Sequence, residues 1–510
     1  MAATTETAGG APRPGNDGDE LAGAYERARS AFEYFVSESA AFMENAGGSQ
    51  VPRCVVRAMS DYMAHHTAQL GAGYPRSARA TAVVSAAHEW LEVLMNTQGQ
   101  GKVVIGPSTS QLAFNLADAY TDALRPGDEI EASHESVLGP WLRSARRSGC
   151  SVRWWQADRA SGASSPAELA ALLGPATRMV VVTHVSNLLG EVLDLAEVVR
   201  LVRGRAPRAH VLADGVAFAP HRAMDVAAWG VDWYVWSSYK VYGPHVAVLY
   251  GRHDAYAALL ATGGAGPNHY FVDPADLTYK FELGGACHEA CAGLLALQDY
   301  LLHLLGRNPD PALKQAELES EPQSLVDTTS RRAATAIPAA PSSGRIDRPS
   351  VEAAFALMTV MEQPLQERLL SYLSSHHAVR LMGSAAAEAA GRVPTISFVH
   401  RRKSSAVLAT ELQAAGFLVR CGHMYARRLV EALVEEGGAL AADAAARQAA
   451  RDGAAATASN TAADGGGAAG SGAPFDVRRA VDEGVVRISL VHYNTPAEVA
   501  ALLAALDRLL

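Results

Sequence analysis

Short apolar runs alternate with helical stretches between residues 103 and 251. The runs cover residues 103–105, 129–131, 152–155, 179–182, 211–212, 233–235 and 246–249. Each is too short for a buried helix and is rich in β-branched or aromatic residues, which is typical of strands. Seven strands joined by helical crossovers predict an α/β fold, with a seven-stranded, mostly parallel sheet covered on both faces.

Helical periodicity precedes this region. Residues 19–42 predict one amphipathic helix with Leu21, Tyr25, Phe32 and Phe35 on its apolar side. A Gly-containing turn at 45–48 then leads to predicted helices over 52–65 and 78–95. The first of these has a proline near its start, as helix entry favours.

The last third of the chain has a different pattern. It predicts strands at 378–381, 395–399, 417–420 and 485–490, together with helices at 351–374, at 405–415 and at the end of the chain. This mixture indicates a smaller α+β C-terminal domain.

Two polar segments interrupt this plan. Residues 309–348 contain several prolines, and residues 436–474 are a low-complexity tract of Ala, Gly, Asp and Ser. Both lack the apolar density needed to form a core. We therefore expect a disordered start (1–18), an N-terminal segment and large domain (19–308), a polar insertion (309–348) and a small domain (349–510) that carries the second insertion (436–474).

Composition narrows the class of protein. The chain has 510 residues, is 49% hydrophobic and has a net charge of −9, which argues against a nucleic-acid binder. It has no run of about 18 strongly apolar residues, so we expect no membrane span. The first 20 residues carry four acids and one arginine, which is unlike a signal or transit peptide. We expect a cytoplasmic protein.

The five cysteines agree with that compartment. They are scattered and odd in number, which is typical of proteins from a reducing environment. Cys287 and Cys291 flank His288 at helical spacing, so a metal site is conceivable. No second ligand pair lies nearby in the sequence, and two cysteines on one helix face are the better interpretation.

Lys240 is the strongest candidate for chemistry. It closes the apolar run 233–239, and an amine at the end of a buried strand has a lowered pKa and becomes nucleophilic. Asp214 ends the run 210–213, and Asn187 and Ser237 also lie at or just beyond strand ends, where parallel sheets bind ligands. A reactive amine and a carboxylate that can hold a ring nitrogen protonated are the minimum required for pyridoxal 5′-phosphate (PLP) chemistry.

Several ordered motifs strengthen this interpretation. They are Ala213-Asp214-Gly215, Pro220-His221, Val231-Asp232, Ser237-Ser238-Tyr239-Lys240-Val241-Tyr242-Gly243-Pro244, the turn at 45–48, the stretch 184–190 and Arg487-Ile488-Ser489-Leu490. In this order they resemble the class V aminotransferase family of fold-type I PLP enzymes, in its cysteine desulfurase-like branch. The resemblance spans residues 42–510 apart from the two insertions.

The resemblance implies roles for individual residues. Lys240 would hold the cofactor covalently and move protons at the substrate Cα, and Asp214 would pair with the pyridine nitrogen. His134, followed by Gly139-Pro140-Trp141, matches the histidine that stacks on the ring, and Asn187 would donate to the phenolic oxygen. Arg487 would bind the substrate α-carboxylate.

A second set of residues matches the phosphate site. Residues 106–111 precede a helical run at 112–124 and supply N–H groups and hydroxyls, and Ser237 would add another hydroxyl. Which of Thr109, Ser110 and Gln111 contacts the phosphate is left open, because this loop differs from the usual family sequence.

Four positions depart from the family pattern. Ala217 replaces a common glutamine, Tyr239 a histidine, and Ala286 the threonine of a Gly-Thr motif. Most importantly, Tyr425 stands where sulfur-abstracting members carry a nucleophilic cysteine. Cys421 lies just before this motif and is the alternative thiol, although a small buried thiol is the usual fate of a free cysteine.

The expected function is therefore that of a homodimeric PLP enzyme, cysteine desulfurase-like, that acts on an amino acid. The alternatives are a class V transaminase or epimerase without sulfur chemistry, and a weakly active scaffold that binds PLP. We expect no metal, no nucleic-acid partner and no membrane partner.

Overall fold

The computed structural model describes residues 17–132, 137–158, 162, 164–263, 266–307, 346–436 and 477–510. The predictions for the first 16 residues and for most of both insertions lie outside these described residues.

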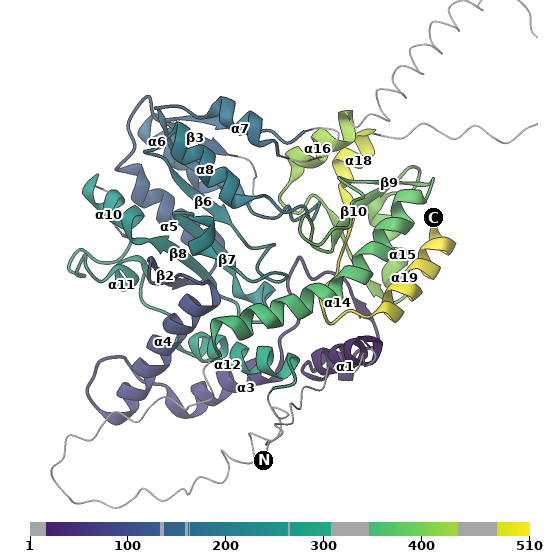
Figure 1. The fold of residues 1–510 in the computed structure, drawn as a ribbon, viewed down its shortest axis with the longest axis horizontal. Helices are drawn as coiled ribbons and strands as arrows, with labels where there is room; N and C mark the ends of the chain where they lie inside the picture. The colour runs from purple at the N-terminus through teal and green to yellow at the C-terminus, as the bar shows by residue number, and fades with distance from the viewer. Residues whose placement is uncertain are drawn as a thin grey trace, which may run out of the picture.

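A seven-stranded sheet forms the centre of the large region (Figure 1). Its order is β2(Gly101–Gly106), β8(Ala247–Arg252), β7(Trp233–Ser237), β6(His210–Asp214), β5(Thr177–Thr183), β3(Glu129–Ala132) and β4(Ser151–Trp154). All strands from β7 to β4 pair in parallel, and β8 runs antiparallel to β7 and β2. All seven predicted strands and the mostly parallel sheet are confirmed.

Helices cover both faces of this sheet (Figure 1). Their bounds are α4(Pro75–Leu94), α5(Thr109–Thr121), α6(Leu138–Ser148), α7(Pro166–Leu172), α8(Leu195–Arg205), α9(Val226–Trp229), α10(His253–Ala261), α11(Leu277–Phe281) and α12(His288–Leu304). Alternation along β7 shows how the two faces form. Trp233 and Val235 pack with α5, α6 and α10, whereas Tyr234 and Trp236 pack into the opposite core with α4, α8 and α12.

The single predicted helix over 19–42 is wrong. The segment forms α1(Asp17–Ser30), a short α2(Tyr34–Ser37) and β1(Ala41–Phe42). Phe32 leaves the helix, bridges to Pro52 and packs its ring against Tyr300 and Tyr493, with centroids 5.2 and 5.0 Å apart. This aromatic burial outweighs the weak preference for continuing the helix.

The next two predicted helices are present. They are α3(Arg53–Asp61), which continues into a π-helical turn at Tyr62–His66, and α4. Helix α3 packs closely against α12.

The C-terminal region contains a four-stranded antiparallel sheet of order β12(Arg420–Gly422), β13(Val485–Ser489), β10(Thr395–His400) and β9(Val379–Leu381). It is accompanied by α14(Arg348–Ser375), α15(Ser405–Ala414), α16(Arg427–Glu436), α18(Val477–Glu483) and α19(Pro496–Leu509). The predicted α+β character is confirmed. The single predicted strand at 417–420 is wrong, because β11(Phe417–Leu418) pairs in parallel with β1 and only β12 joins the four-stranded sheet.

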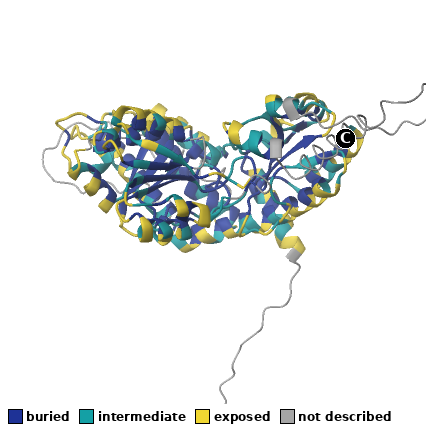
Figure 2. Cartoon of the chain, turned by 90° about the horizontal axis from the view of Figure 1, so that it is seen from above, coloured by how far each residue is buried: buried dark blue, intermediate teal, exposed yellow. Residues whose placement is uncertain are grey.

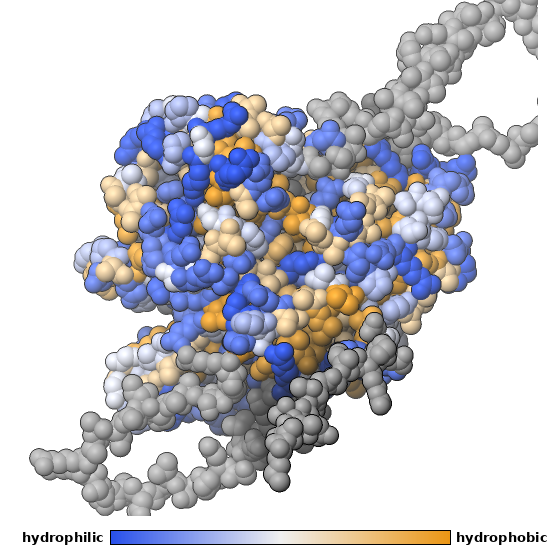
Figure 3. Space-filling model, in the orientation of Figure 1, coloured by the Kyte–Doolittle hydropathy of each residue, from blue (hydrophilic) through white to orange (hydrophobic). Residues whose placement is uncertain are grey.

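The two regions lie side by side, each with buried strands at its centre (Figure 2). The long helix α14 runs from α12 to β9 and α19 and so ties them together (Figure 1). On the face shown in Figure 3, apolar side chains gather around the middle of α14. Hydrophilic side chains dominate the edges of this face. Across the described ranges, no helix has both the length and the apolar character that a membrane crossing requires.

Candidate active site

Lys240 lies in a 3-10 turn, Ser238–Lys240, that directly follows β7. The pKa of its ammonium group is lowered to about 8, mainly by burial and also by the nearby Arg487 guanidinium, while Asp214 opposes the shift. About a tenth of the Lys240 side chain is therefore a free amine at pH 7, far more than for an ordinary lysine, and the free amine is the nucleophilic form.

Asp214 is the last residue of β6 and is buried. Its Oδ1 accepts a hydrogen bond from the Val216 N–H at 2.9 Å, and its carbonyl accepts one from the His184 N–H, also at 2.9 Å. Thr183, at the end of β5, is its register partner, and the hydroxyl of Thr183 is buried without a partner among the described residues. The carboxylate is thus fixed at the carboxyl end of the sheet.

A buried aromatic pair supports this position, and sequence reasoning missed it. The His184 ring stacks on Phe218 at 3.8 Å and 14°, and its Nδ1 lies 3.0 Å from the Tyr234 hydroxyl. Burial lowers the pKa of His184 to about 3, so the imidazole stays neutral. Alternation places Tyr234 on an inner face of β7, but no sequence pattern indicates its partner.

Arg487, on β13, reaches the same site from the C-terminal region. It is only 2% exposed, and its Nη1 donates to the Asn187 carbonyl at 3.1 Å. Its Nε and Nη2 are buried and have no partner within the described residues. Burial lowers the pKa of this guanidinium to about 10. Two unpaired donors on a buried guanidinium are costly, and they fit the two oxygens of a carboxylate.

Asn187 lies between this arginine and the loop that follows β12. Its Nδ2 donates to the Met424 carbonyl at 2.7 Å, and its Oδ1 is buried without a partner in the described part of the chain. The amide nitrogen expected to meet a phenolic oxygen is therefore engaged in this structure.

Arg420 is a second site arginine that sequence reasoning did not single out. It lies directly opposite Arg487 on the neighbouring strand and forms an ion pair with Glu44 at 2.7 Å. It contributes to lowering the pKa of both Lys240 and Arg487. Only the pairing of β12 with β13 shows that the two arginines are neighbours.

The predicted phosphate loop lies at the start of α5. The Ser108 side chain caps the helix by accepting from the Gln111 N–H at 3.1 Å, and the Thr109 Oγ1 lies 2.6 Å from the Ser237 Oγ. Ser110 and Gln111 are exposed, and Gln111 Nε2 donates to Asn115 at 2.9 Å. Thr109 and Ser237 are thus brought together, whereas the other two side chains point to solvent or along the helix.

The alternative thiol is positioned less favourably. Cys421 is the register partner of Val486, whereas Arg420 is the partner of Arg487. Successive residues of a strand alternate between faces, so Cys421 lies on the Val486 face, which packs into the C-terminal core. Its thiol points away from the face that carries Arg487.

Tyr425 occupies the loop after β12. It is 83% exposed, and both it and Met424 have left-handed backbone conformations, with φ of 60° and 47°. Non-glycine residues rarely adopt this conformation. The Met424 carbonyl is the acceptor for Asn187, so this loop is anchored to the site by one hydrogen bond.

Three further positions were singled out from the sequence: His134, Ala217 and Ala286. His134 lies outside the described residues, and its predicted role stays a prediction. Ala217 is buried beside the aromatic residues near Asp214, and Ala286 follows two glycines with left-handed φ of 80° and 89°. Within the described residues, no three His, Cys, Asp or Glu side chains are arranged to hold a metal ion.

This arrangement fits PLP. A lysine with a lowered pKa, a buried carboxylate, paired hydroxyls at a helix N-terminus and an arginine with two unpaired donors surround the carboxyl ends of β5, β6 and β7. Together with the seven-stranded sheet and the antiparallel C-terminal sheet, they define the fold of fold-type I PLP enzymes.

Comparison with known proteins identifies the family. The chain belongs to the aminotransferase class-V family, whose model matches residues 41–332, and this family is PLP-dependent. The chain is 32% identical to aminotransferase-like protein FGM3 of Gibberella zeae, over 92% of this chain and 94% of that protein. It is also 32% identical to a cysteine desulfurase of Dickeya dadantii, over 51% of this chain and 66% of that protein. The fold is similar to that of the apo cysteine desulfurase of Thermococcus onnurineus, with a TM-score of 0.67, 18% identity and coverage of 95% of this chain and 97% of that one.

Proposed function

We propose that the protein is a PLP-dependent enzyme that acts at the Cα of a free α-amino acid. The observation that carries this proposal is the pairing of Lys240, with a pKa of about 8, and the buried Arg487, whose Nε and Nη2 are unpaired within the described residues. An amine that can carry the cofactor, near a guanidinium that can bind a carboxylate, suits a substrate with an amino group and a carboxylate on the same carbon.

In this proposal, each candidate site residue has its own task. Bound PLP supplies an aldehyde and a ring that stabilises negative charge at Cα. Lys240 holds the cofactor and then moves a proton to and from Cα. Asp214, held by the Val216 N–H, keeps the ring nitrogen protonated. Arg487 orients the substrate by its α-carboxylate, and Thr109 and Ser237 hold the phosphate.

The site favours transamination, epimerisation or elimination over sulfur transfer. A sulfur relay needs a thiol that reaches the substrate side chain, but Tyr425 fills the position of the family cysteine and Cys421 lies on the other face of β12. Cysteine desulfurization is the second candidate, because relatives and structural neighbours bear that name.

The two candidates differ in their products. The purified protein, supplied with PLP, is incubated with L-cysteine, L-alanine and other amino acids while the cofactor absorbance, keto acid and sulfide are followed. We expect a spectral change with at least one amino acid and no sulfide that depends on Cys421. Sulfide from L-cysteine that disappears in Cys421→Ala would establish the desulfurase, and a spectrum unchanged by every amino acid would favour the scaffold.

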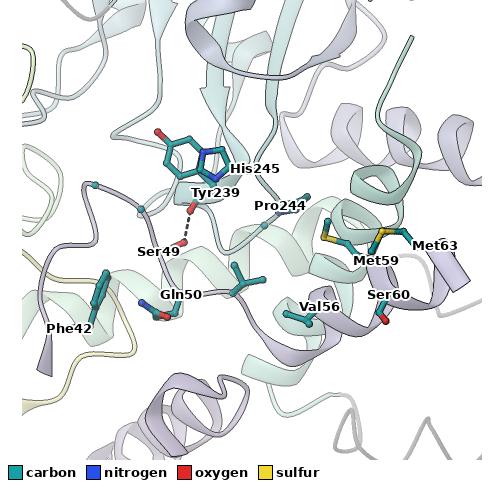
Figure 4. A pocket seen from close by; sticks show the side chains of 14 residues that line it. Phe42, Ser49, Gln50, Val56, Met59, Ser60, Met63, Tyr239, Pro244 and His245 are labelled. Carbon is teal, nitrogen blue, oxygen red and sulfur yellow. Dashed lines mark hydrogen bonds between the residues drawn. The ribbon is translucent and has the colours of Figure 1, made fainter. Parts of the chain in front are cut away.

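We further propose that the protein is a homodimer. A pocket of about 610 Å³ adjoins the site, and it is lined by Phe42, Gly47, Gly48, Ser49, Gln50, Val51, Val56, Met59, Ser60, Met63, Tyr239, Gly243, Pro244 and His245 (Figure 4). Val56 on α3 and Met63 on its π-helical extension are 54% and 56% exposed. Apolar side chains left in water beside a functional site mark an interface, and a second copy would bury them.

Light scattering after size-exclusion chromatography tests the dimer. Val56→Asp combined with Met63→Asp should shift the protein towards the monomer. Val407→Asp, which places one aspartate at a 49% exposed valine on α15, should leave the mass unchanged. A monomeric wild type, or a dimer insensitive to the double variant, would exclude this surface as the interface.

The compartment proposed for the protein is the cytoplasm. All five cysteines are free thiols in the structure, which supports a reducing environment. Fractionation of the source cells with an antibody to the protein would test this.

A further inference from the structure

We propose that His184 and Tyr234 are positioning residues, which hold the turn after β6 so that the Asp214 carboxylate faces the ring nitrogen of the cofactor. The inference rests on the proposed function, because the ring nitrogen in question is that of PLP. Phe218 and Trp229 complete the surroundings of His184, and the four aromatic side chains are here named the aromatic box. The sequence assigns a role to none of the four.

The turn that follows Asp214 supplies one of the hydrogen bonds that orient its carboxylate. The Val216 N–H donates to the Asp214 Oδ1 at 2.9 Å, so the direction of the carboxylate depends on where this turn lies. Within the turn, the Phe218 N–H donates to the Gly215 carbonyl at 3.0 Å. The Asp214 carbonyl accepts from the His184 N–H at 2.9 Å. The carboxylate, the turn and His184 are therefore linked through the backbone.

The aromatic box fixes the turn by packing. The His184 ring stacks on Phe218 with centroids 3.8 Å apart and planes at 14°, and Trp229 meets the same ring edge-on at 4.6 Å. The Tyr234 ring lies so close to Gly215 that a Cβ atom there would come within 2.1 Å of the tyrosine hydroxyl oxygen. Only glycine fits at this position, and the Tyr234 ring blocks movement of the turn towards β7.

One hydrogen bond joins the two polar groups of the box. The His184 Nδ1 lies 3.0 Å from the Tyr234 hydroxyl, and both side chains are buried. Burial lowers the pKa of His184 to about 3 and raises the pKa of Tyr234 well above its ordinary value, so both groups are neutral at physiological pH. An imidazolium here would offset the charge of Asp214, whereas a neutral pair leaves that charge to attract a protonated ring nitrogen. The box therefore orients Asp214 without competing for it.

The experiment compares PLP with deaza-PLP, in which a C–H group replaces the ring nitrogen. The full chain and its variants are freed of cofactor and titrated with each compound while absorbance is followed. Tyr234→Phe keeps the ring beside Gly215 but removes the hydroxyl, and His184→Phe keeps a ring on Phe218 but removes Nδ1. Each should weaken PLP binding by about 3- to 10-fold, which is part of the strength of a hydrogen bond to a charged group, and should change deaza-PLP binding by less than about twofold.

Asp214→Asn is the reference, because it removes the charge itself. The ratio of PLP affinity to deaza-PLP affinity should fall further in this variant than in either box variant. Tyr120→Phe is the matched control. It breaks another buried hydrogen bond between a tyrosine and a histidine, that of Tyr120 with His210 at the opposite end of β6, and should leave the ratio unchanged. Because the ratio is measured within each variant, a partial loss of folded protein does not imitate the expected result.

The outcomes separate this inference from the proposed function. Equal weakening of PLP and deaza-PLP in both box variants, or no weakening of either compound, overturns the positioning role and leaves a PLP enzyme standing. A wild-type protein that binds neither compound overturns both.

Discussion

The two sides of the active site are built differently. The strand-end side consists of Asp214, Ser237 and Lys240, which lie at or just after the carboxyl ends of β6 and β7. The loop side consists of residues 423–425, which follow β12 in the C-terminal region. Asp214 and Ser237 on the first side are buried, and backbone hydrogen bonds hold the segments next to them. The second side ends in an 83% exposed tyrosine with a left-handed backbone.

This difference indicates a division of labour. Groups that bind a cofactor must be held precisely, and strand ends inside a packed sheet provide that rigidity. A group that selects the reaction contacts the variable side chain of the substrate, and an exposed loop can change without disturbing the sheet. On the strand-end side the chain keeps the expected Asp214, Ser237 and Lys240, although Ala217 and Tyr239 depart from the pattern. On the loop side it departs at Tyr425.

The sharpest test of the strand-end side is Lys240→Ala. In the proposed function it removes the amine that holds the cofactor and moves the proton, so we expect activity to fall by about 10²- to 10⁴-fold. The measurement is turnover of the preferred amino acid, together with reduction by borohydride and peptide mapping. Lys102→Ala, at a half-buried lysine paired with Glu92, is the control and should keep full activity. Borohydride labelling elsewhere in Lys240→Ala at wild-type yield would contradict the assignment.

The lowered pKa of Lys240 predicts a pH dependence. A folded-state pKa of about 8, against the ordinary 10.5, means that the amine is deprotonated as pH rises through 8 and is largely protonated below it. At pH 8 the free-amine fraction exceeds that of an ordinary lysine by about 10²-fold. The rate of PLP capture by the cofactor-free protein should therefore rise to a plateau with a midpoint near pH 8.

Asp214→Asn sharpens the same measurement. The carboxylate raises the pKa of Lys240 against the effect of burial, so its removal should move the midpoint to lower pH. A midpoint near 10 in the wild type would show that the lysine is not desolvated as the structure indicates. An upward shift in the variant would show that Asp214 does not raise the pKa of Lys240.

Sequence reasoning predicted the strand-end side well, for a physical reason. Parallel strands are continuous apolar runs, and polar residues after them fall at the same sheet edge, so Asp214 and Lys240 could be paired from sequence alone. The loop side could not be predicted in this way. That Arg420 opposes Arg487, and that Cys421 faces the core, depends on the register between two strands more than 60 residues apart in the chain. The broken helix after Ser30 has a similar cause, because Phe32 finds Tyr300 and Tyr493 only in the folded molecule.

Arg487→Lys tests the substrate clamp that connects the two sides. Lysine keeps the charge but loses the two-pronged geometry, so kcat/KM for an α-amino acid should fall by about 10- to 100-fold. PLP affinity should not change. Arg200→Lys, at an exposed arginine paired with Glu197 at 2.6 Å, is the matched control and should have no effect. An equal loss with an amine substrate that lacks the carboxylate would place the role of Arg487 elsewhere.

The smallest effect is expected on the loop side, from Cys421→Ala. The thiol lies on the core face of β12, opposite Val486, so its removal should change turnover and PLP affinity by less than about twofold and stability by about 1 kcal/mol or less. Tyr425→Phe should likewise leave PLP affinity unchanged, while altering the relative rates for amino acids with different side chains. These two results together separate binding of the cofactor from choice of the substrate. Cys421→Ala could instead abolish product formation with L-cysteine while sparing other amino acids. The thiol would then have to reach the substrate by a rearrangement of β12, and the loop side would take part in catalysis as the strand ends do.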